Sequence, residues 1–165
     1  MMGNPSFDIV SELNWQEVDN AVNQAQKELL QRYDFKGSKS SIDYDKTGKK
    51  ITLVADDDFK LRALTDILEG RFAKRGVSIK SLTYKTPESA FEGTLRQAVE
   101  LTSGLPSEKA KELVKIIKDA KFKVQAQIEG DKLRVSSAKK DELQAVIAHL
   151  RSINFSLPLQ FTNYR

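Results

Sequence analysis

The residues with the clearest capacity for binding chemistry lie in one predicted strand hairpin, residues 122–137. Gly130-Asp131 separates two runs of alternating polar and apolar residues, as a two-residue hairpin turn requires. This register puts Gln127 opposite Arg134 and collects the apolar side chains on one face. The other face carries Lys123, Gln125, Gln127, Glu129, Lys132, Arg134 and Ser136. Such cations and amides can bind phosphate oxygens and base edges, but a solvated sheet face shows the same pattern, and both interpretations stand.

A second candidate is the turn QRYDFKG, residues 31–37, where a predicted helix ends before Gly37. Arg32, Phe35 and Lys36 cluster there. A cation beside an aromatic ring can hold a phosphate and stack a base. The alternative interpretation is that Phe35 packs in the core while the two cations are solvated.

Catalytic and metal-binding signals are poor. His149 is the only histidine, cysteine is absent, and neither a GxxxxGK[ST] loop nor a GxSxG motif occurs. The acidic run Asp56–Asp58 could hold a cation, but acidic residues also favour a helix start. We therefore expect a protein that is not an enzyme, with no metal and no cofactor.

Composition and charge restrict the class of protein. The 165 residues contain no apolar segment of the roughly 20 residues that a membrane span needs. The absence of cysteine fits a reducing compartment, and the start of the chain lacks a secretory signal pattern, so we expect a cytoplasmic protein. Residues 1–92 have 14 basic and 15 acidic residues, whereas residues 93–165 have 13 basic and 8 acidic ones. This asymmetry indicates either an anionic partner for the second half or a lysine-rich solvated surface.

The predicted elements form a βαββαβ order twice. The first copy has a strand at 6–13, a helix capped by Asn14, a hairpin at 40–56 with Tyr44 opposite Ile51, a helix that the run Asp56–Asp58 opens and a strand at 77–84. Residues 86–93 are the predicted boundary between the repeats. The second copy has a strand at 94–102, a helix after Pro106, the hairpin already described, a helix from about Ala138 and a strand at 158–165.

This order predicts the α+β class with two tandem ferredoxin-like domains, each a four-stranded antiparallel sheet with two helices on one face. The last strand should then add Gln160, Thr162 and Tyr164 to the open face of the second sheet. Tyr33 continues an apolar helical stripe. The aromatic residues expected to face the core are Trp15, Phe59, Phe72 and Phe161.

The strings PSFDIVSEL (5–13), RYDFKG (32–37), KVQAQIEGDKLRVSSAKKDELQAVI (123–147) and PLQFTNYR (158–165) closely resemble the YajQ family of bacterial proteins. The resemblance implies that the domains exchange their first strands. One domain is then residues 14–103, using strand 94–102, and the other is residues 1–13 plus 104–165, using strand 6–13. It also implies nucleotide binding, with GTP, cyclic di-GMP and tRNA-like RNA as associated ligands, and a role in transcription. It implies no catalytic residue.

The resulting hypothesis is a nucleotide-binding regulatory protein that binds cyclic di-GMP or a guanine nucleotide and acts on transcription through a partner. The alternatives are an RNA- or DNA-binding protein without a small-ligand pocket, and a protein-interaction adaptor. We expect Lys123, Arg134 and Arg165 to bind phosphate, Gln125, Gln127 and Gln160 to bind base edges or sugar hydroxyls, Tyr164 or Phe35 to stack a base, and Arg32, Lys36 and Arg75 to complete a site between the domains.

Overall fold

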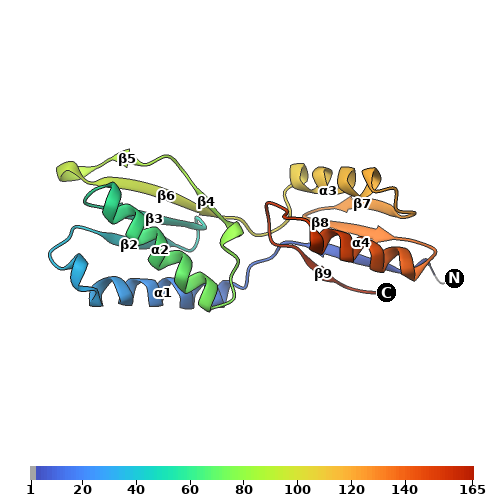
Figure 1. The fold of residues 1–165 in the computed structure, drawn as a ribbon, viewed down its shortest axis with the longest axis horizontal. Coiled ribbons are helices and arrows are strands. Elements are labelled where there is room, and N and C mark those ends of the chain that lie inside the picture. Colours follow the sequence, from blue (N-terminus) through green and yellow to red (C-terminus); the bar gives the residue numbers. More distant parts are fainter. Residues whose placement is uncertain (1–2) are drawn as a thin grey trace. The chain divides into compact units, whose positions relative to one another are not determined.

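A computed structural model describes residues 3–165, and the chain divides into two compact units (Figure 1). Unit 1 is the chain up to Glu12 together with Ser103–Arg165, and unit 2 is Leu13–Thr102. Each unit combines two α-helices with one antiparallel sheet. The predicted α+β class is confirmed, and the arrangement is compatible with two tandem ferredoxin-like domains.

Unit 2 contains sheet B, in which the strands lie in the order β2-β3-β6-β4, and β5 also pairs with β6. Strand β6 is the last strand of unit 2 in the sequence, but in the sheet it lies between β3 and β4. The elements are α1 (Trp15–Gln31), β2 (Ser41–Asp45), β3 (Lys50–Ala55), α2 (Asp58–Lys74), β4 (Leu82–Tyr84), β5 (Glu88–Ser89) and β6 (Leu95–Leu101), with short 3-10 turns η1 (Tyr33–Phe35), η2 (Ile79–Ser81) and η3 (Phe91–Gly93). The predicted strand 77–84 is therefore shorter, because its first half forms the η2 turn.

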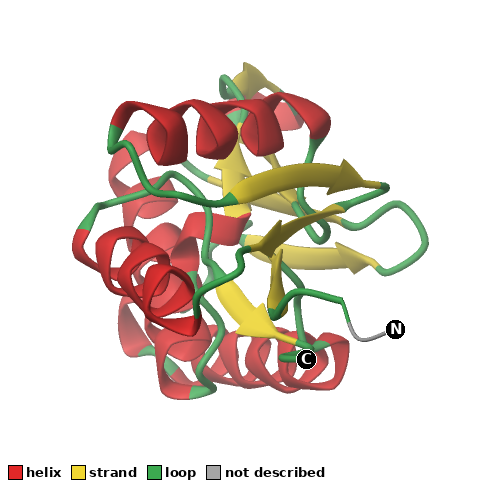
Figure 2. Cartoon of the chain, turned by 90° about the vertical axis from the view of Figure 1, so that its right-hand side faces the viewer, coloured by secondary structure: helices red, strands yellow, loops and turns green. Residues whose placement is uncertain are grey.

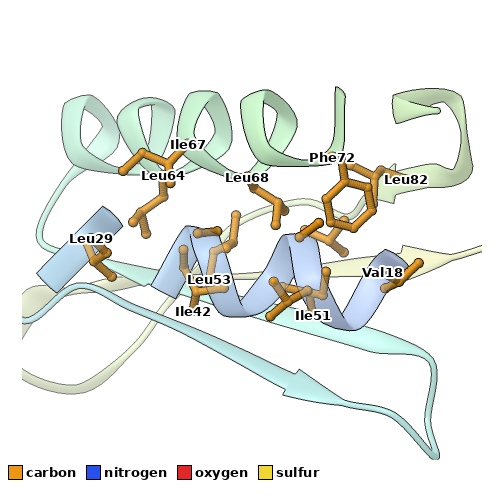
Figure 3. Close-up of a cluster of buried hydrophobic side chains, with 14 of the residues drawn as sticks. Val18, Leu29, Ile42, Ile51, Leu53, Leu64, Ile67, Leu68, Phe72 and Leu82 are labelled. Atoms are coloured by element: carbon orange, nitrogen blue, oxygen red, sulfur yellow. The ribbon is translucent and has the colours of Figure 1, made fainter. Parts of the chain in front are cut away.

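The two helices of unit 2 begin at side-chain caps. Asn14 Oδ1 accepts a hydrogen bond from the Glu17 backbone N–H at 3.2 Å, as predicted, and Asp57 Oδ1 accepts one from Lys60 N–H at 2.8 Å. Apolar side chains from both helices meet those of β3, among them the fully buried Leu53 and Phe72 (Figure 3). Each such side chain stabilises the fold by about 1.5–3 kcal/mol, so this packing holds the helices on one face of the sheet.

Two expectations for aromatic residues in unit 2 are wrong. Phe59 is 75% exposed and Tyr33 is 86% exposed. Helix α1 ends at Gln31, so the helical spacing no longer governs Tyr33. Phe59 stands in the first turn of α2, two residues before Leu61, which is the first residue of that helix to be buried in the core.

Unit 1 contains sheet A, with the strand order β7-β8-β1-β9. Strand β1 lies between β8 and β9, antiparallel to both, so residues from the two ends of the chain meet in one sheet. Helices α3 and α4 lie on one side of the strands (Figure 2) and bury Phe7, Ile9, Leu133 and Val135 beneath them. The elements are β1 (Ser6–Val10), α3 (Ser107–Asp119), β7 (Gln125–Glu129), β8 (Lys132–Ser136), α4 (Lys140–Ser152) and β9 (Gln160–Thr162).

Both predicted hairpin registers are confirmed. Gln127 pairs with Arg134 across β7 and β8, and Tyr44 pairs with Ile51 across β2 and β3. Gly130 takes a φ of +62°, which glycine adopts without steric cost and which a tight hairpin turn needs. Among the described residues, no helix is both long enough and apolar enough to cross a membrane.

Candidate functional site

The face of sheet A that the helices leave open carries the polar side chains that the hairpin pattern predicts. Gln125 and Gln127 are exposed there, and Arg134 and Ser136 of β8 are half-buried beside them. Strand β1 adds a carboxylate to the same face, because Asp8 pairs directly with Arg134 on one side and with Thr162 on the other. The open face therefore has an anionic residue on a central strand.

Asp8 neutralises the cations around it. Only 2% of Asp8 is exposed, its Oδ1 lies 3.2 Å from Arg134 Nε, and its Oδ2 lies 3.6 Å from Lys132 Nζ. Asn163 Nδ2 donates a hydrogen bond to Oδ2 at 2.9 Å, and Arg134 Nη1 is also 3.6 Å from Glu129. Burial would raise the pKa of Asp8, but the hydrogen bonds from Asn163 and Arg134 and the charges of Lys132 and Arg134 outweigh it, and the pKa is lowered. The face is thus electrically balanced rather than a free cationic surface.

Gln160 and Lys123, which were also predicted to bind a ligand, both make hydrogen bonds within the protein. Both ends of the Gln160 amide hold the backbone of Glu12, where Oε1 accepts from N–H at 2.8 Å and Nε2 donates to the carbonyl at 3.1 Å. Lys123 lies just before β7, where its backbone N–H donates to Glu142 and its carbonyl accepts from the Ser137 hydroxyl. Its ammonium makes no ion pair with the described residues, so Lys123 keeps a free charge.

The expectation that Tyr164 lies on the open face of sheet A is wrong. Asn163 has a φ of +56°, which breaks the alternation of side chains along the strand. The Tyr164 ring instead lies 6.1 Å from the ring of the buried Phe7, measured between centroids, and beside helix α4. Tyr164 remains 57% exposed, so part of its ring is open to solvent.

Tyr164 and Arg165 line a pocket of about 310 Å³ with the start of α4, which we call the α4 pocket. Arg165 is held there because its backbone N–H donates to the Ser6 carbonyl at 3.0 Å and its carbonyl accepts from Ser6 N–H at 3.3 Å. Lys140 is the first residue of α4 and Gln144 follows one turn later. The complete lining is Pro5, Ser6, Lys140, Leu143, Gln144, Tyr164 and Arg165.

The α4 pocket combines groups that suit an anionic, partly aromatic ligand. Lys140 and Arg165 supply two positive charges, Gln144 supplies an amide and Tyr164 an aromatic ring, while no carboxylate side chain lines the pocket. The sequence pattern pointed to Tyr164 and Arg165 but missed Lys140 and Gln144. Lys140 and Gln144 are four residues apart just after a predicted helix start, and this spacing indicates that they lie on the same face of the helix.

A larger pocket of about 410 Å³ lies between α3 and the segment after α4. It is lined by the apolar side chains of Ile116, Ile153 and Phe155 and by Glu112, whose carboxylate lies 3.3 Å from Lys109 Nζ. That carboxylate already neutralises one of the cations at the pocket. We therefore take the α4 pocket as the better candidate for an anionic ligand.

The RYDFKG turn lies in unit 2, where Phe35 is only 6% exposed and packs in the core. Lys60 Nζ lies 4.8 Å from the centre of its ring, and Arg32 lies 5.6 Å from it. Arg32 is paired with Asp34 at 2.7 Å, which raises the pKa of Arg32, chiefly through the hydrogen bond between them. Phe35 therefore has no free face for a base, which corresponds to the core interpretation of this turn.

The other cations predicted for a site also lie in unit 2. Lys36 Nζ lies 5.9 Å from the centre of the exposed Tyr33 ring. Arg75 ends α2, and its Nη2 lies 2.8 Å from Glu17 Oε1, a hydrogen bond that is the main cause of the lowered pKa of Glu17. None of these cations lines the α4 pocket. Within residues 3–165, no group of three or more histidine, cysteine or acidic residues is placed to hold a metal ion.

Comparison with known proteins covers nearly the whole chain. A family model described as "Nucleotide-binding protein YajQ-like" matches residues 5–165. A protein of Endomicrobium trichonymphae is 67% identical over 160 residues, covering 97% of each chain. Proteins of Carboxydothermus hydrogenoformans and Heliobacterium modesticaldum are 54% and 52% identical over 165 residues, covering all of this chain and 100% and 99% of theirs. All three are named "Nucleotide-binding protein", and this chain belongs to the YajQ-like family.

Proposed function

We propose that the protein binds a nucleotide in the α4 pocket of unit 1. The observation that carries the proposal is the set of lining side chains, which has two cations, an amide and a half-exposed aromatic ring but no carboxylate side chain. Lys140 and Arg165 would bind phosphate oxygens, Gln144 would bind a base edge or a sugar hydroxyl, and the Tyr164 ring would stack against the base. The names of the relatives support the same class of ligand.

The size of the α4 pocket suits a small ligand. Small-molecule sites in proteins commonly have volumes of about 300–1,000 Å³, and the α4 pocket is at the lower limit at about 310 Å³. One nucleotide unit fits this volume, with any further phosphate or nucleoside extending outward. Guanine nucleotides and cyclic di-GMP are the first candidates, because the family resemblance implies them.

The proposed mechanism is binding rather than turnover. The lining offers no carboxylate, imidazole or thiol side chain that would serve as a base or nucleophile. We propose that the bound nucleotide regulates, in the cytoplasm, the affinity of the protein for a partner that acts in transcription. A ligand can do this only if it binds the partner-competent state more tightly than the other state.

Calorimetric titration of the whole chain with GMP, GTP and cyclic di-GMP tests the proposal. Saturable binding is expected for at least one of them. Lys140→Glu should weaken that binding by about tenfold or more, because a charge-assisted hydrogen bond is replaced by repulsion. Lys111→Glu is the matched control: Lys111 is an exposed lysine of the same unit that does not line the pocket. Equal effects of the two substitutions, or no binding of any nucleotide, would contradict the proposal.

A second candidate, binding of RNA or DNA along its phosphates, is favoured by one observation. Several exposed lysines lie in the loop before β7 and in the loop between β8 and α4. The Ser137 hydroxyl donates a hydrogen bond to the Lys123 carbonyl at 2.8 Å and so joins these two loops. Lys121, Lys123 and Lys139 belong to these loops, and Lys140 follows them. None of the four makes an ion pair with the described residues, so this end could contact several phosphates in succession.

A further inference from the structure

Strand β7 is an edge of sheet A, and the backbone groups of two of its five residues have no hydrogen-bond partner among residues 3–165. It pairs with β8 on one side and with no strand on the other. Beside a two-residue turn the flanking residues exchange backbone hydrogen bonds, so Gln125, Gln127 and Glu129 direct theirs toward β8. Ala126 and Ile128 then direct their N–H and C=O groups away from the sheet. Within residues 3–165, no backbone hydrogen bond involves these outward groups.

The other exposed edges carry features that oppose the addition of a further strand. Strand β9 has three residues and follows Pro158, while β4 and β5 have three and two residues with Pro87 between them. Strand β2 has five residues but places Asp43 and Asp45 on its solvent face. If two β2 strands paired in antiparallel fashion about Asp43, two carboxylates would stand directly opposite each other, which is destabilising.

Strand β7 has none of these protections. It contains five residues, no proline and one carboxylate, Glu129, which lies 3.6 Å from Arg134 and is thereby neutralised. Its Ile128 side chain is 38% exposed, an apolar group that the sheet and helix leave partly uncovered. An edge with free backbone groups and an uncovered apolar side chain is suited to pairing with another strand.

The sequence of β7 is complementary to itself. In an antiparallel pair of two β7 strands related by a two-fold axis at Gln127, Ala126 of each copy lies opposite Ile128 of the other. Both of these residues have outward backbone groups, so they would form hydrogen-bonded pairs. On the solvent face Gln127 meets its own copy, and Gln125 meets Glu129, so no like charges are opposed.

The charges of the neighbouring helix do not oppose this approach. Helix α3 packs near β7, and its exposed residues include both acidic and basic ones, such as Glu108, Lys111, Glu112 and Lys115. Two copies brought together at β7 would thus not face each other with surfaces of a single charge. The exposed part of Ile128 would be covered by Ala126 of the second copy, which removes apolar surface from water.

We propose that β7 is the docking edge for a second copy of this chain, so that two A sheets join through antiparallel β7 strands. The occupant is β7 of the other copy rather than an unrelated peptide, because the strand matches itself in backbone pattern, apolar contact and charge. This proposal is independent of nucleotide binding, since no β7 residue lines the α4 pocket. A failure of either proposal would leave the other standing.

Sedimentation of the whole chain over a series of protein concentrations provides the first test. A monomer–dimer equilibrium is expected. Gln127→Lys should weaken the dimer several-fold, because it places two ammonium groups opposite each other, and Gln127→Glu should also weaken it. An equimolar mixture of the two variants should dimerise better than either alone. Gln31→Lys, at an exposed glutamine in α1 of unit 2, is the matched control and should behave as the wild type.

Amide hydrogen exchange provides a second readout that identifies the edge. The N–H groups of Ala126 and Ile128 should exchange more slowly as the protein concentration rises, whereas that of Gln127, which already points to β8, should change little. A protein that stays monomeric throughout the series overturns the proposal. So does a dimer in which Ala126 and Ile128 gain no protection, or one that Gln127→Lys leaves unchanged.

Discussion

The carboxylate of Asp8 lies 3.2 Å from the guanidinium of Arg134, although 126 positions separate the two residues in the chain. Asp8 stands in β1, directly opposite Arg134 in β8, and its second oxygen accepts a hydrogen bond from Asn163 after β9. One nearly buried carboxylate therefore joins three neighbouring segments of sheet A. It also removes Arg134 from the set of free cations that the hairpin pattern predicts.

Replacing Asp8 by Asn should lower the free energy of unfolding of unit 1 by about 1–3 kcal/mol, because it removes a charged acceptor that two half-buried cations share. Urea unfolding followed by far-UV circular dichroism measures this change. The only tryptophan, Trp15, belongs to unit 2, so its fluorescence reports on the other unit. Glu129→Gln is the control and should cost less, since its carboxylate is 31% exposed. Equal effects of Asp8→Asn and Glu129→Gln would rule out a special role for Asp8.

The stability of unit 1 should fall in acid, and Asp8 should account for part of the fall. Burial would raise its pKa in the folded protein, but the hydrogen bonds from Asn163 and Arg134 and the charges of Lys132 and Arg134 outweigh burial, so the pKa is lowered. A lowered folded pKa gives stability that is present above the unfolded pKa, near 4, and is lost as the pH falls through the folded value. Urea midpoints measured at successive pH values should therefore decline below about pH 4.

Asp8→Asn provides the control for this pH dependence. The variant has no titrating group at position 8, so its midpoint should start lower and decline less steeply than that of the wild type. Parallel curves for the two proteins would assign the acid sensitivity to other carboxylates of unit 1.

Arg134→Glu should destabilise unit 1 rather than act mainly on a ligand. The new carboxylate would stand directly opposite the buried Asp8 and beside Glu129. Three acidic groups would then repel one another where Arg134 now neutralises two of them. Circular dichroism should show a lower unfolding midpoint. Lys140→Glu is the contrasting variant: Lys140 is exposed and makes no ion pair with the described residues, so its unfolding should stay close to that of the wild type. Intact stability of Arg134→Glu would show that the Asp8 pair is weak.

Local features of this fold could be predicted from the sequence because local rules determine them. The register of the β7–β8 hairpin follows from the turn at Gly130-Asp131 and from the alternation of polar and apolar residues along both strands. The start of α1 follows from the capping residue Asn14 and from Glu17 three residues later. Pairing between distant strands has no such local signal. Hairpin periodicity does not show that Asp8 lies opposite Arg134, and so it overestimates the free positive charge of the sheet.

The candidate site was only partly predictable, for reasons that concern individual residues. Alternation placed Tyr164 with Thr162, but the positive φ of Asn163 interrupts the strand and turns Tyr164 toward α4. Lys140 and Gln144 join Tyr164 and Arg165 only because the end of the chain pairs with Ser6 and packs near the start of α4. Those contacts depend on tertiary structure, so composition and spacing could not reveal the pocket.

Tyr164→Leu should weaken nucleotide binding by roughly tenfold, because stacking of a base on an aromatic side chain contributes about 1–3 kcal/mol. Tyr164→Phe keeps the ring and should bind nearly as the wild type does. Since the ring also lies 6.1 Å from that of Phe7, thermal unfolding of both variants is needed to separate a loss of packing from a loss of stacking. Equal affinity of the Leu and Phe variants would show that the ring does not contact the base.

The dependence of affinity on salt should distinguish a nucleotide pocket from a track for RNA. Each phosphate that a protein neutralises on a single strand contributes about −0.7 to the slope of log affinity against log salt. With only Lys140 and Arg165 in the pocket, a nucleotide should give a shallow slope. A short single-stranded RNA that also contacts Lys121, Lys123 and Lys139 should give a slope about two and a half times steeper, because five contacts replace two. Lys123→Ala should make the slope for RNA shallower by the contribution of about one phosphate contact, and it should leave nucleotide affinity unchanged. A steep slope for both ligands, or a loss of nucleotide affinity in Lys123→Ala, would place the nucleotide on the loop lysines instead of in the α4 pocket.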